Sequence, residues 1–169
     1  NSYRPRPIEQ VIEELKRSGS RRVLFIDDHI MGHPAWAREL FEALIPLKIK
    51  FGGQSTLLVA KDKELLALAR RAGCFSLFVG VESVIQDTLD AANKRFNRTN
   101  KYLELIGNYH RAGISLVAGT IFGFDTDEPS VFHKTVAFYD AAGVAVPNYG
   151  ILTPFPGSGT FAQFEAEGR

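Results

Sequence analysis

Two aspartates and two histidines stand close together after the first apolar segment of the chain. Asp27, Asp28, His29 and His33 combine carboxylates with imidazoles, and both groups are ligands for divalent metal ions. The same residues also suit a turn capped by Asp28, with the histidines on a solvated loop. A metal-dependent hydrolase of the barrel type is therefore one hypothesis for this chain, and a loop without chemistry is the other.

A carboxylate and a hydroxyl follow the apolar segment 78–81. Glu82 and Ser83 stand where a buried strand would emerge into solvent. A carboxylate at such a place can accept two hydrogen bonds from a ribose diol or from an ammonium group. The alternative interpretation is that Glu82 caps the helix that follows.

Backbone could contact a ligand at two further places. Gly119 and Gly123 lie in and just after an apolar strand, where a missing side chain admits a flat ring, or else serves a bulge or tight packing. Leu152, Thr153 and Pro154 begin a turn-rich exit from the last apolar strand. That exit could hold the edge of a ligand or form a plain loop.

Composition and charge exclude several classes of partner. The 169 residues carry 20 Lys and Arg against 19 Asp and Glu, so charge gives no reason to expect nucleic acid or an anionic membrane. The basic segment 93–98 with Lys101 suits an anionic ligand tail or a solvated surface. No apolar run is long enough to cross a bilayer. The only cysteine, Cys74, cannot by itself form a disulfide, a zinc site or an iron–sulfur site.

Helices and short apolar strands alternate along the whole chain. Three helices end at a small residue followed by glycine, at Gly73, Gly113 and Gly143, because the position past a helix often needs left-handed backbone. Apolar spacing predicts helices that begin at Ile8, Pro34 and Asp62, and near residues 85, 102 and 128. The last of these is expected to bury Phe132, Val136 and Tyr139. The predicted strands are residues 23–27, 49–54, 77–81, 115–121 and 149–153.

Polar or turn residues end every predicted strand, from Asp27 and Gln54 to Thr153. Function collects at the carboxyl ends of parallel strands, and a barrel gathers all of those ends around one mouth. We therefore predict an α/β fold, a partial (β/α) TIM-like barrel of about five parallel strands with outer helices. The sequence opens on a helix, so we expect the first strand to be missing and residues 1–169 to be a truncated single domain.

In order along the chain, these segments resemble the radical S-adenosylmethionine (SAM) superfamily, specifically its cobalamin-associated branch. The stretches that carry the resemblance are residues 23–28, 64–66, 72–74, 78–83, 93–97, 121–127, 152–157 and 167–169. The resemblance implies a partial six-unit (β/α) barrel of the radical SAM type, with SAM lying across the strand ends.

The resemblance also implies roles by position. Asp27 and Asp28 occupy the position at which members of the family bind the methionine amino group of SAM, usually through a Gly-Gly-Glu motif. Gln54, together with Glu82 and Ser83, would face the methionine carboxylate and the ribose.

Three residues, Gly119, Ile121 and Gly123, resemble the family's Gly-x-Ile-x-Gly element beside the adenine. The glutamate that usually follows this element is replaced by Thr126. Residues 152–154 would offer backbone to the adenine edge, and no residue of this chain is expected to bind metal.

The family's Cys-x-x-x-Cys-x-x-Cys motif, which binds a [4Fe–4S] cluster, does not occur in this sequence. The resemblance therefore places the cluster ligands outside this chain, and a cobalamin domain likewise. It implies a parent enzyme that cleaves SAM reductively and uses the 5′-deoxyadenosyl radical on a small-molecule substrate. This would be a cobalamin-dependent methyltransferase or a related Fe–S oxidoreductase in the cytoplasm, and the chain alone would be inactive.

Two other hypotheses remain open at this point. One is the hydrolase built on Asp27 and its neighbours, and the other is a degenerate barrel kept as a non-catalytic binding module. Whatever its function, an unclosed barrel would leave sheet edges through which the chain could self-associate, because unpaired strand edges are templates for pairing.

Overall fold

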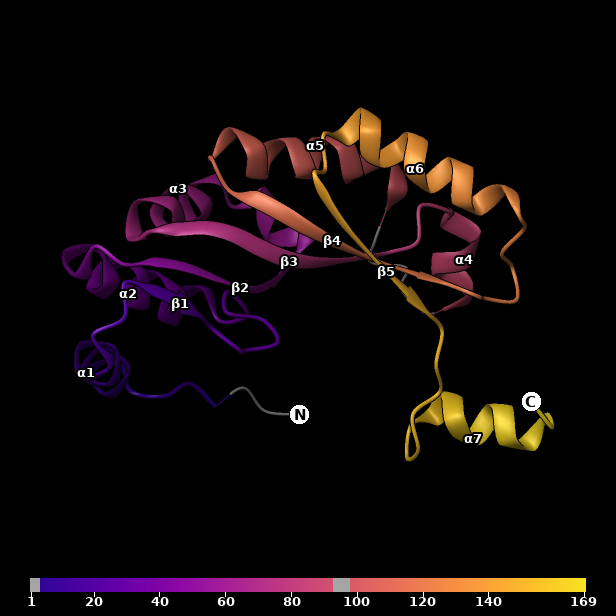
Figure 1. Cartoon of the computed structure of the whole chain (residues 1–169), viewed down its shortest axis with the longest axis horizontal. Coiled ribbons are helices and arrows are strands. Elements are labelled where there is room, and N and C mark those ends of the chain that lie inside the picture. Colours follow the sequence, from indigo (N-terminus) through magenta and orange to yellow (C-terminus); the bar gives the residue numbers. More distant parts are fainter. Residues whose placement is uncertain (1–3, 93–97) are drawn as a thin grey trace.

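Five strands form one sheet in the computed structural model, which describes residues 4–92 and 98–169. Their spatial order is the order of the chain, and all neighbouring pairs are parallel. The strands are β1 (Arg22–Leu24), β2 (Lys50–Thr56), β3 (Cys74–Glu82), β4 (Ser115–Phe122) and β5 (Val146–Ile151). The sheet twists and curls into an open half-barrel, which confirms the predicted partial barrel (Figure 1).

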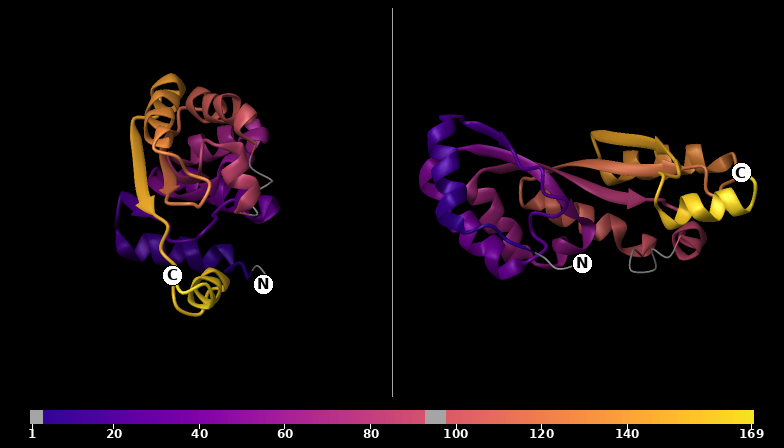
Figure 2. Two further views of the ribbon diagram at one scale, coloured as in Figure 1. Left: turned by 90° about the vertical axis from the view of Figure 1, so that its right-hand side faces the viewer. Right: turned by 90° about the horizontal axis from the view of Figure 1, so that it is seen from below.

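Helices connect successive strands, as a parallel sheet requires. Helix α1 (Ile8–Ser18) precedes β1. The connecting helices are α2 (Pro34–Leu44), α3 (Lys63–Ala72), α4 (Gln86–Ala91), α5 (Thr99–Arg111) and α6 (Ser130–Ala142), and α7 (Gly159–Ala166) follows the last strand. Two short 3-10 helices are η1 (Ile45–Leu47) and η2 (Leu57–Lys61). Figures 1 and 2 show α5 and α6 on one side of the sheet and α7 on the other.

The two faces of the sheet differ in burial. On β3, Leu77, Val79 and Val81 are fully buried beneath the helices, whereas Phe78 and Glu82 alternate with them and stay partly accessible. We call the second face the inner face. It carries Gln54 of β2, Phe78, Gly80 and Glu82 of β3, and Val117, Gly119 and Ile121 of β4. Any ligand of the half-barrel must lie on this face.

Local signals in the sequence explain where α3 begins and ends. The Leu65 N–H donates to Asp62 Oδ1 at 2.9 Å, which confirms Asp62 as the residue that caps this helix. At the other end Gly73 has a φ of 110°, and a Cβ there would lie 2.0 Å from the Ile49 carbonyl oxygen. Only glycine fits this junction, so the chain can turn directly from α3 into β3.

Three expectations about elements were wrong in detail. The edge strands are shifted, because β1 ends at Leu24 and β5 begins at Val146, earlier than predicted. Helix α6 buries Val131, Thr135 and Tyr139, whereas Phe132 and Val136 are 53% and 51% exposed. Helix α7 was not predicted at all. None of the helices in the two described ranges is both long and apolar enough to span a bilayer.

Candidate functional site

A pocket of about 370 Å³ lies on the inner face, at the carboxyl ends of β3, β4 and β5. Glu82, Ile121 and Leu152 each line it from the end of a different strand. Asp125 from the loop after β4 and Phe164 from α7 complete its walls. We call it the strand-end pocket. It brings together one predicted site residue from each of three strands, which the sequence places far apart.

Glu82 reaches this pocket through an unusual backbone. Its φ is 68°, a left-handed conformation rare for residues other than glycine, and the pairing register with β4 shifts between Gly80 and Glu82. A Cβ on Gly80 would lie 2.6 Å from Glu82 Oε1, so the carboxylate folds back over the glycine. The bulge and the glycine thus place a carboxylate at the pocket's edge.

Two buried tyrosines stand near that carboxylate. The Tyr102 hydroxyl of α5 donates to the Val81 carbonyl oxygen at 2.9 Å, directly before Glu82. Burial, and to a lesser degree the charge of Glu82, raises the pKa of Tyr139 to about 12. Both tyrosines are therefore neutral hydrogen-bonding groups: Tyr102 holds the end of β3, and Tyr139 is hydrogen-bonded to the Thr120 hydroxyl of β4.

Ser83 does not line the strand-end pocket. Only 2% of it is exposed, and its hydroxyl accepts the Ile85 N–H at 3.1 Å. Its role in this structure is to shape the turn into α4.

The loop after β4 is fixed by Asp127, a residue without a predicted role. Asp127 Oδ2 accepts the N–H groups of Gly123 and Phe124 at 2.9 and 3.1 Å. The buried Thr88 of α4 donates to Asp127 Oδ1 at 3.4 Å. Gly123 has a φ of 99°, so glycine is required at this turn. The available signal was an aspartate just after a glycine turn, a common way to satisfy free N–H groups.

At Gly119 the space of a side chain is occupied by an aromatic ring of the same chain. A Cβ at Gly119 would lie 2.7 Å from Cζ of Phe78, so the phenyl ring lies over the glycine backbone. Of the two interpretations of Gly119, close packing within the protein is the one that the structure shows.

Gln54 lies in a second hollow of the inner face, together with Leu24, Ile26 and Phe78. The hollow is largely apolar, and Leu24 and Ile26 are 66% and 73% exposed. Gln54 therefore shares a face with Glu82 but not a pocket.

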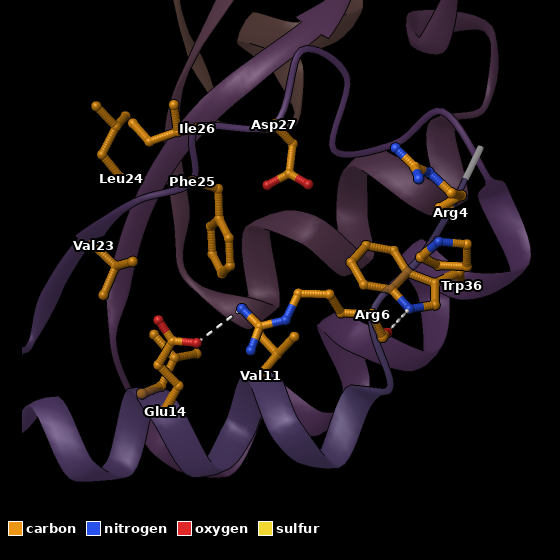
Figure 3. Close-up of a pocket in the computed structure, with 12 residues that line it drawn as sticks. Arg4, Arg6, Val11, Glu14, Val23, Leu24, Phe25, Ile26, Asp27 and Trp36 are labelled. Carbon is orange, nitrogen blue, oxygen red and sulfur yellow. Dashed lines mark hydrogen bonds and ion pairs between the residues drawn. The ribbon is translucent and has the colours of Figure 1, made fainter. Parts of the chain in front are cut away.

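Asp27 belongs to a third pocket, between the end of β1, helix α1 and the segment before it (Figure 3). Arg4 lines the same pocket, and the Trp36 indole N–H donates to the Arg6 carbonyl oxygen at 2.9 Å. Asp28 is exposed on the following turn. The structure thus separates these two aspartates from the strand-end pocket.

The four residues suggested as metal ligands have separate surroundings. The Trp36 N–H donates to Nδ1 of His33 at 3.2 Å, so His33 caps α2. His29 lies beside the Ser55 hydroxyl at 3.5 Å, and burial lowers its pKa. Among the residues that the structure describes, no three His, Cys, Asp or Glu gather closely enough to hold a metal ion. The hydrolase hypothesis has no geometric support here.

The turn after β5 uses much of its own hydrogen-bonding capacity. The Leu152 N–H donates to the Phe122 carbonyl oxygen at 2.8 Å, and the Thr153 hydroxyl donates to the Ile151 carbonyl oxygen at 3.0 Å. Leu152 lines the strand-end pocket, Pro154 is half-buried and Thr153 is exposed. Residues 93–97, which include most of the basic segment and one stretch of the family resemblance, lie outside the described residues.

A protein-family model described as the radical SAM superfamily matches residues 1–139. The chain belongs to the radical SAM superfamily. A bacteriochlorophyllide d C-12(1)-methyltransferase of Chlorobaculum tepidum is 32% identical over 170 residues, which cover 97% of this chain and 37% of that protein. A hopanoid C-2 methylase of Rhodopseudomonas palustris is 31% identical and is matched over 95% of this chain and 32% of its own length. This radical SAM chain therefore spans about a third of the length of these two relatives.

Solved structures share the fold of this radical SAM chain. The methyltransferase TsrM of Kitasatospora setae, with cobalamin and a [4Fe–4S] cluster bound, superposes with a TM-score of 0.80 at 16% identity, over 96% of this chain and 34% of TsrM. The cobalamin-dependent SAM radical enzyme OxsB superposes with a TM-score of 0.72 at 18% identity, over 98% and 26% of the two chains. At these identities the likeness concerns the fold.

The residues present fit SAM but not a cluster. Glu82 beside the apolar Ile121 and Phe164 offers a carboxylate for a diol and apolar walls for a base. A [4Fe–4S] cluster needs several thiolates. This radical SAM chain has only Cys74, which is fully buried and whose pKa is raised by burial to about 12.

Proposed function

We propose that this chain is the SAM-binding core of a radical SAM enzyme, and that the parent protein is a cobalamin-dependent methyltransferase. The observation that carries the proposal is the strand-end pocket, where Glu82, Ile121 and Leu152 meet in a chain of this superfamily. Two curated relatives above 30% identity are named as methyl-transferring enzymes, which supports the reaction class.

In this proposal the adenosine part of SAM occupies the strand-end pocket. The Glu82 carboxylate accepts hydrogen bonds from the ribose hydroxyls, because a carboxylate has two oxygens to match a diol. Ile121 and Phe164 flank the adenine, and the turn at Leu152 lies at its edge. Gly123 contributes by its left-handed turn, which directs the loop of Asp125 along the pocket.

The methionine part extends along the inner face toward β2. Gln54 is the polar group of the hollow on that side and offers an amide to the carboxylate of SAM. Asp27 and Asp28 stand farther on, at the end of β1, where a carboxylate can receive the ammonium group.

When bound to a reduced [4Fe–4S] cluster, SAM supplies a 5′-deoxyadenosyl radical that abstracts hydrogen from carbon. The residues of this chain bind and orient SAM and keep water from the pocket; the cluster ligands and the cobalamin site belong to other parts of the parent protein. The chain by itself is therefore expected to be inactive.

The methyl acceptor is proposed to be an apolar small molecule on the inner face. Leu24, Ile26 and Phe78 form an accessible apolar surface beside Gln54, and burying it under a substrate is favourable. The relatives are named for bacteriochlorophyllide d and for a hopanoid, and TsrM is described with tryptophan as its substrate. Cytoplasmic location and the absence of a nucleic-acid partner stay predictions.

The edge of β1 is the proposed place of a further strand of the parent protein. Helix α1 buries none of its residues, and its Val11 and Leu15 line the pocket of Figure 3 together with residues of β1. A strand inserted beside β1 would cover both the apolar side chains and the edge of the sheet. If the edge stays open, self-association through it is expected.

The test is SAM binding by the full-length protein, reconstituted anaerobically with iron and sulfide. Glu82→Gln keeps the shape of the side chain and removes its charge, and Glu42→Gln on the exposed face of α2 is the matched control. We expect the first variant to bind radiolabelled SAM about tenfold more weakly, because hydrogen bonds to a charged acceptor are the stronger ones. A wild-type protein that shows no cluster absorbance and releases no 5′-deoxyadenosine would overturn the proposal.

A further inference from the structure

Helix α7 forms one wall of the strand-end pocket but is weakly embedded in the protein. It contributes Thr160, Gln163 and Phe164 to the lining. None of its residues is buried, and it lies across the inner face from α5 and α6 (Figure 2). The segment before it, residues 152–158, is rich in proline and glycine and only partly buried. Something other than core packing must therefore hold this wall in place.

Arg169, three residues beyond the end of α7, supplies this contact. Arg169 Nη2 donates to Asp125 Oδ1 at 2.6 Å and Nη1 donates to Oδ2 at 2.9 Å, a two-point pairing of guanidinium and carboxylate. The guanidinium carbon of Arg169 also lies 4.1 Å from the centre of the Phe164 ring. One side chain thus binds the β4 loop and an aromatic ring of the pocket wall at once.

The backbone is arranged for this pairing at both ends. Gly168 has a φ of 72°, and the Arg169 N–H donates to the Phe164 carbonyl oxygen at 2.8 Å, so the chain turns back along α7. At the other end Asp127 fixes the loop that carries Asp125 through the N–H groups of Gly123 and Phe124. Residues 167–169, one of the stretches that carry the family resemblance, therefore meet another of them, residues 121–127.

We propose that Arg169 is a positioning residue that, by pairing with Asp125 and stacking on Phe164, holds α7 as the adenine-side wall of the SAM pocket. This inference rests on the proposed function. Arg169 does not touch SAM in this arrangement; it acts through Phe164, which does. Asp125 and Phe164 both line the pocket, so the pairing sets the distance between two of its walls.

Two measurements on the full-length holoprotein test this inference. The first is the dissociation constant of radiolabelled SAM for Arg169→Gln, Asp125→Asn and the exchanged pair Asp125→Arg with Arg169→Asp. We expect each single variant to bind about fivefold more weakly, since an exposed pair is worth little and the stacking adds to it. The exchanged pair should recover part of this loss. Arg17→Gln, on the exposed face of α1, is the matched control.

The second measurement is limited proteolysis within residues 152–158, which needs no ligand. Arg169→Gln should be cleaved several-fold faster than wild type, because α7 separates from the pocket more often. Equal SAM affinities, or equal cleavage rates, for wild type and Arg169→Gln would overturn the inference. A wild-type protein that fails to bind SAM would instead overturn the proposed function, and the cleavage rates would still decide whether the pairing holds α7.

Discussion

The phenyl ring of Phe78 on β3 lies over Gly119 of β4, with Cζ only 2.7 Å from where a Cβ on the glycine would stand. The two residues lie on adjacent strands of the inner face, where Phe78 pairs in register with Val117 and Gly80 pairs with Gly119. Phe78 also lines the hollow that contains Gln54. The ring therefore covers the sheet between the two hollows of this face, and the glycine is the reason that it can.

Gly119→Ala should destabilise the protein by about 1–3 kcal/mol, because the new methyl group displaces the Phe78 ring in a packed sheet. Urea unfolding followed by circular dichroism measures this change. Gly150→Ala on β5 is the matched control, since a Cβ there meets nothing closer than 3.8 Å. In a Phe78→Leu background the cost of Gly119→Ala should shrink; an unchanged cost would show that the ring is not its cause.

The hydroxyls of Thr120 and Tyr139 form a hydrogen bond that is buried between β4 and α6. Tyr139→Phe leaves the Thr120 hydroxyl without this partner, and we expect a loss of about 1–3 kcal/mol in the free energy of unfolding. Adding Thr120→Val should restore part of it, because both polar groups are then gone. A double variant that is as unstable as the sum of the two single ones would argue against this pairing.

Cys74 should resist alkylation in the folded protein. Its side chain is fully buried and burial raises its thiol pKa to about 12, so almost no thiolate exists at mildly alkaline pH. Mass spectrometry after treatment with iodoacetamide should show unmodified protein in buffer and complete modification in denaturant. Rapid modification of the folded protein would contradict the position of Cys74 within the core.

The carboxyl group of Asp125 should titrate below its ordinary range. Hydrogen bonds from the Arg169 guanidinium lower its pKa from the ordinary value of 3.8. Because the pKa is lower in the folded protein than in the unfolded chain, the pairing adds to the stability of the fold at and above pH 3.8. This added stability is lost as the pH falls through the lower, folded-state pKa. Carboxyl carbon shifts followed by NMR should show this, and Arg169→Gln should return the pKa toward the ordinary value.

The repeating units could be predicted from the sequence because each carries its own local signals. Asp62 and Gly73 mark the two ends of α3, and the alternation of helix and strand determines a parallel sheet. Edge elements were less predictable. β5 contains Pro147, which is tolerated in an edge strand. In a sequence, however, a proline argues against a strand, so the start of β5 was not recognised. Helix α7 was hidden by glycines, although Ser158, which accepts the Phe161 N–H at 3.1 Å, was the cap signal.

The candidate site could be predicted only in part. Glu82 and Leu152 were recognisable because each follows an apolar strand, whereas Ile121 was indicated by the family resemblance. Asp127 carries a local signal, because it closely follows a glycine turn and accepts the N–H groups of Gly123 and Phe124. The contribution of Arg169 depends on how the chain folds back, because it reaches Asp125 in a loop that is distant in sequence. That contact follows from tertiary structure rather than from local pattern.

The order of the strands bears on how the chain acquires its structure. Because β1 to β5 follow one another in space as they do along the chain, every pairing joins two strands that are consecutive in the sequence. Such contacts close short loops, so the entropy lost at each step is modest. During synthesis each new strand finds its template already formed by the one before. The sheet can thus grow one unit at a time from the ribosome, without waiting for a distant part of the polypeptide.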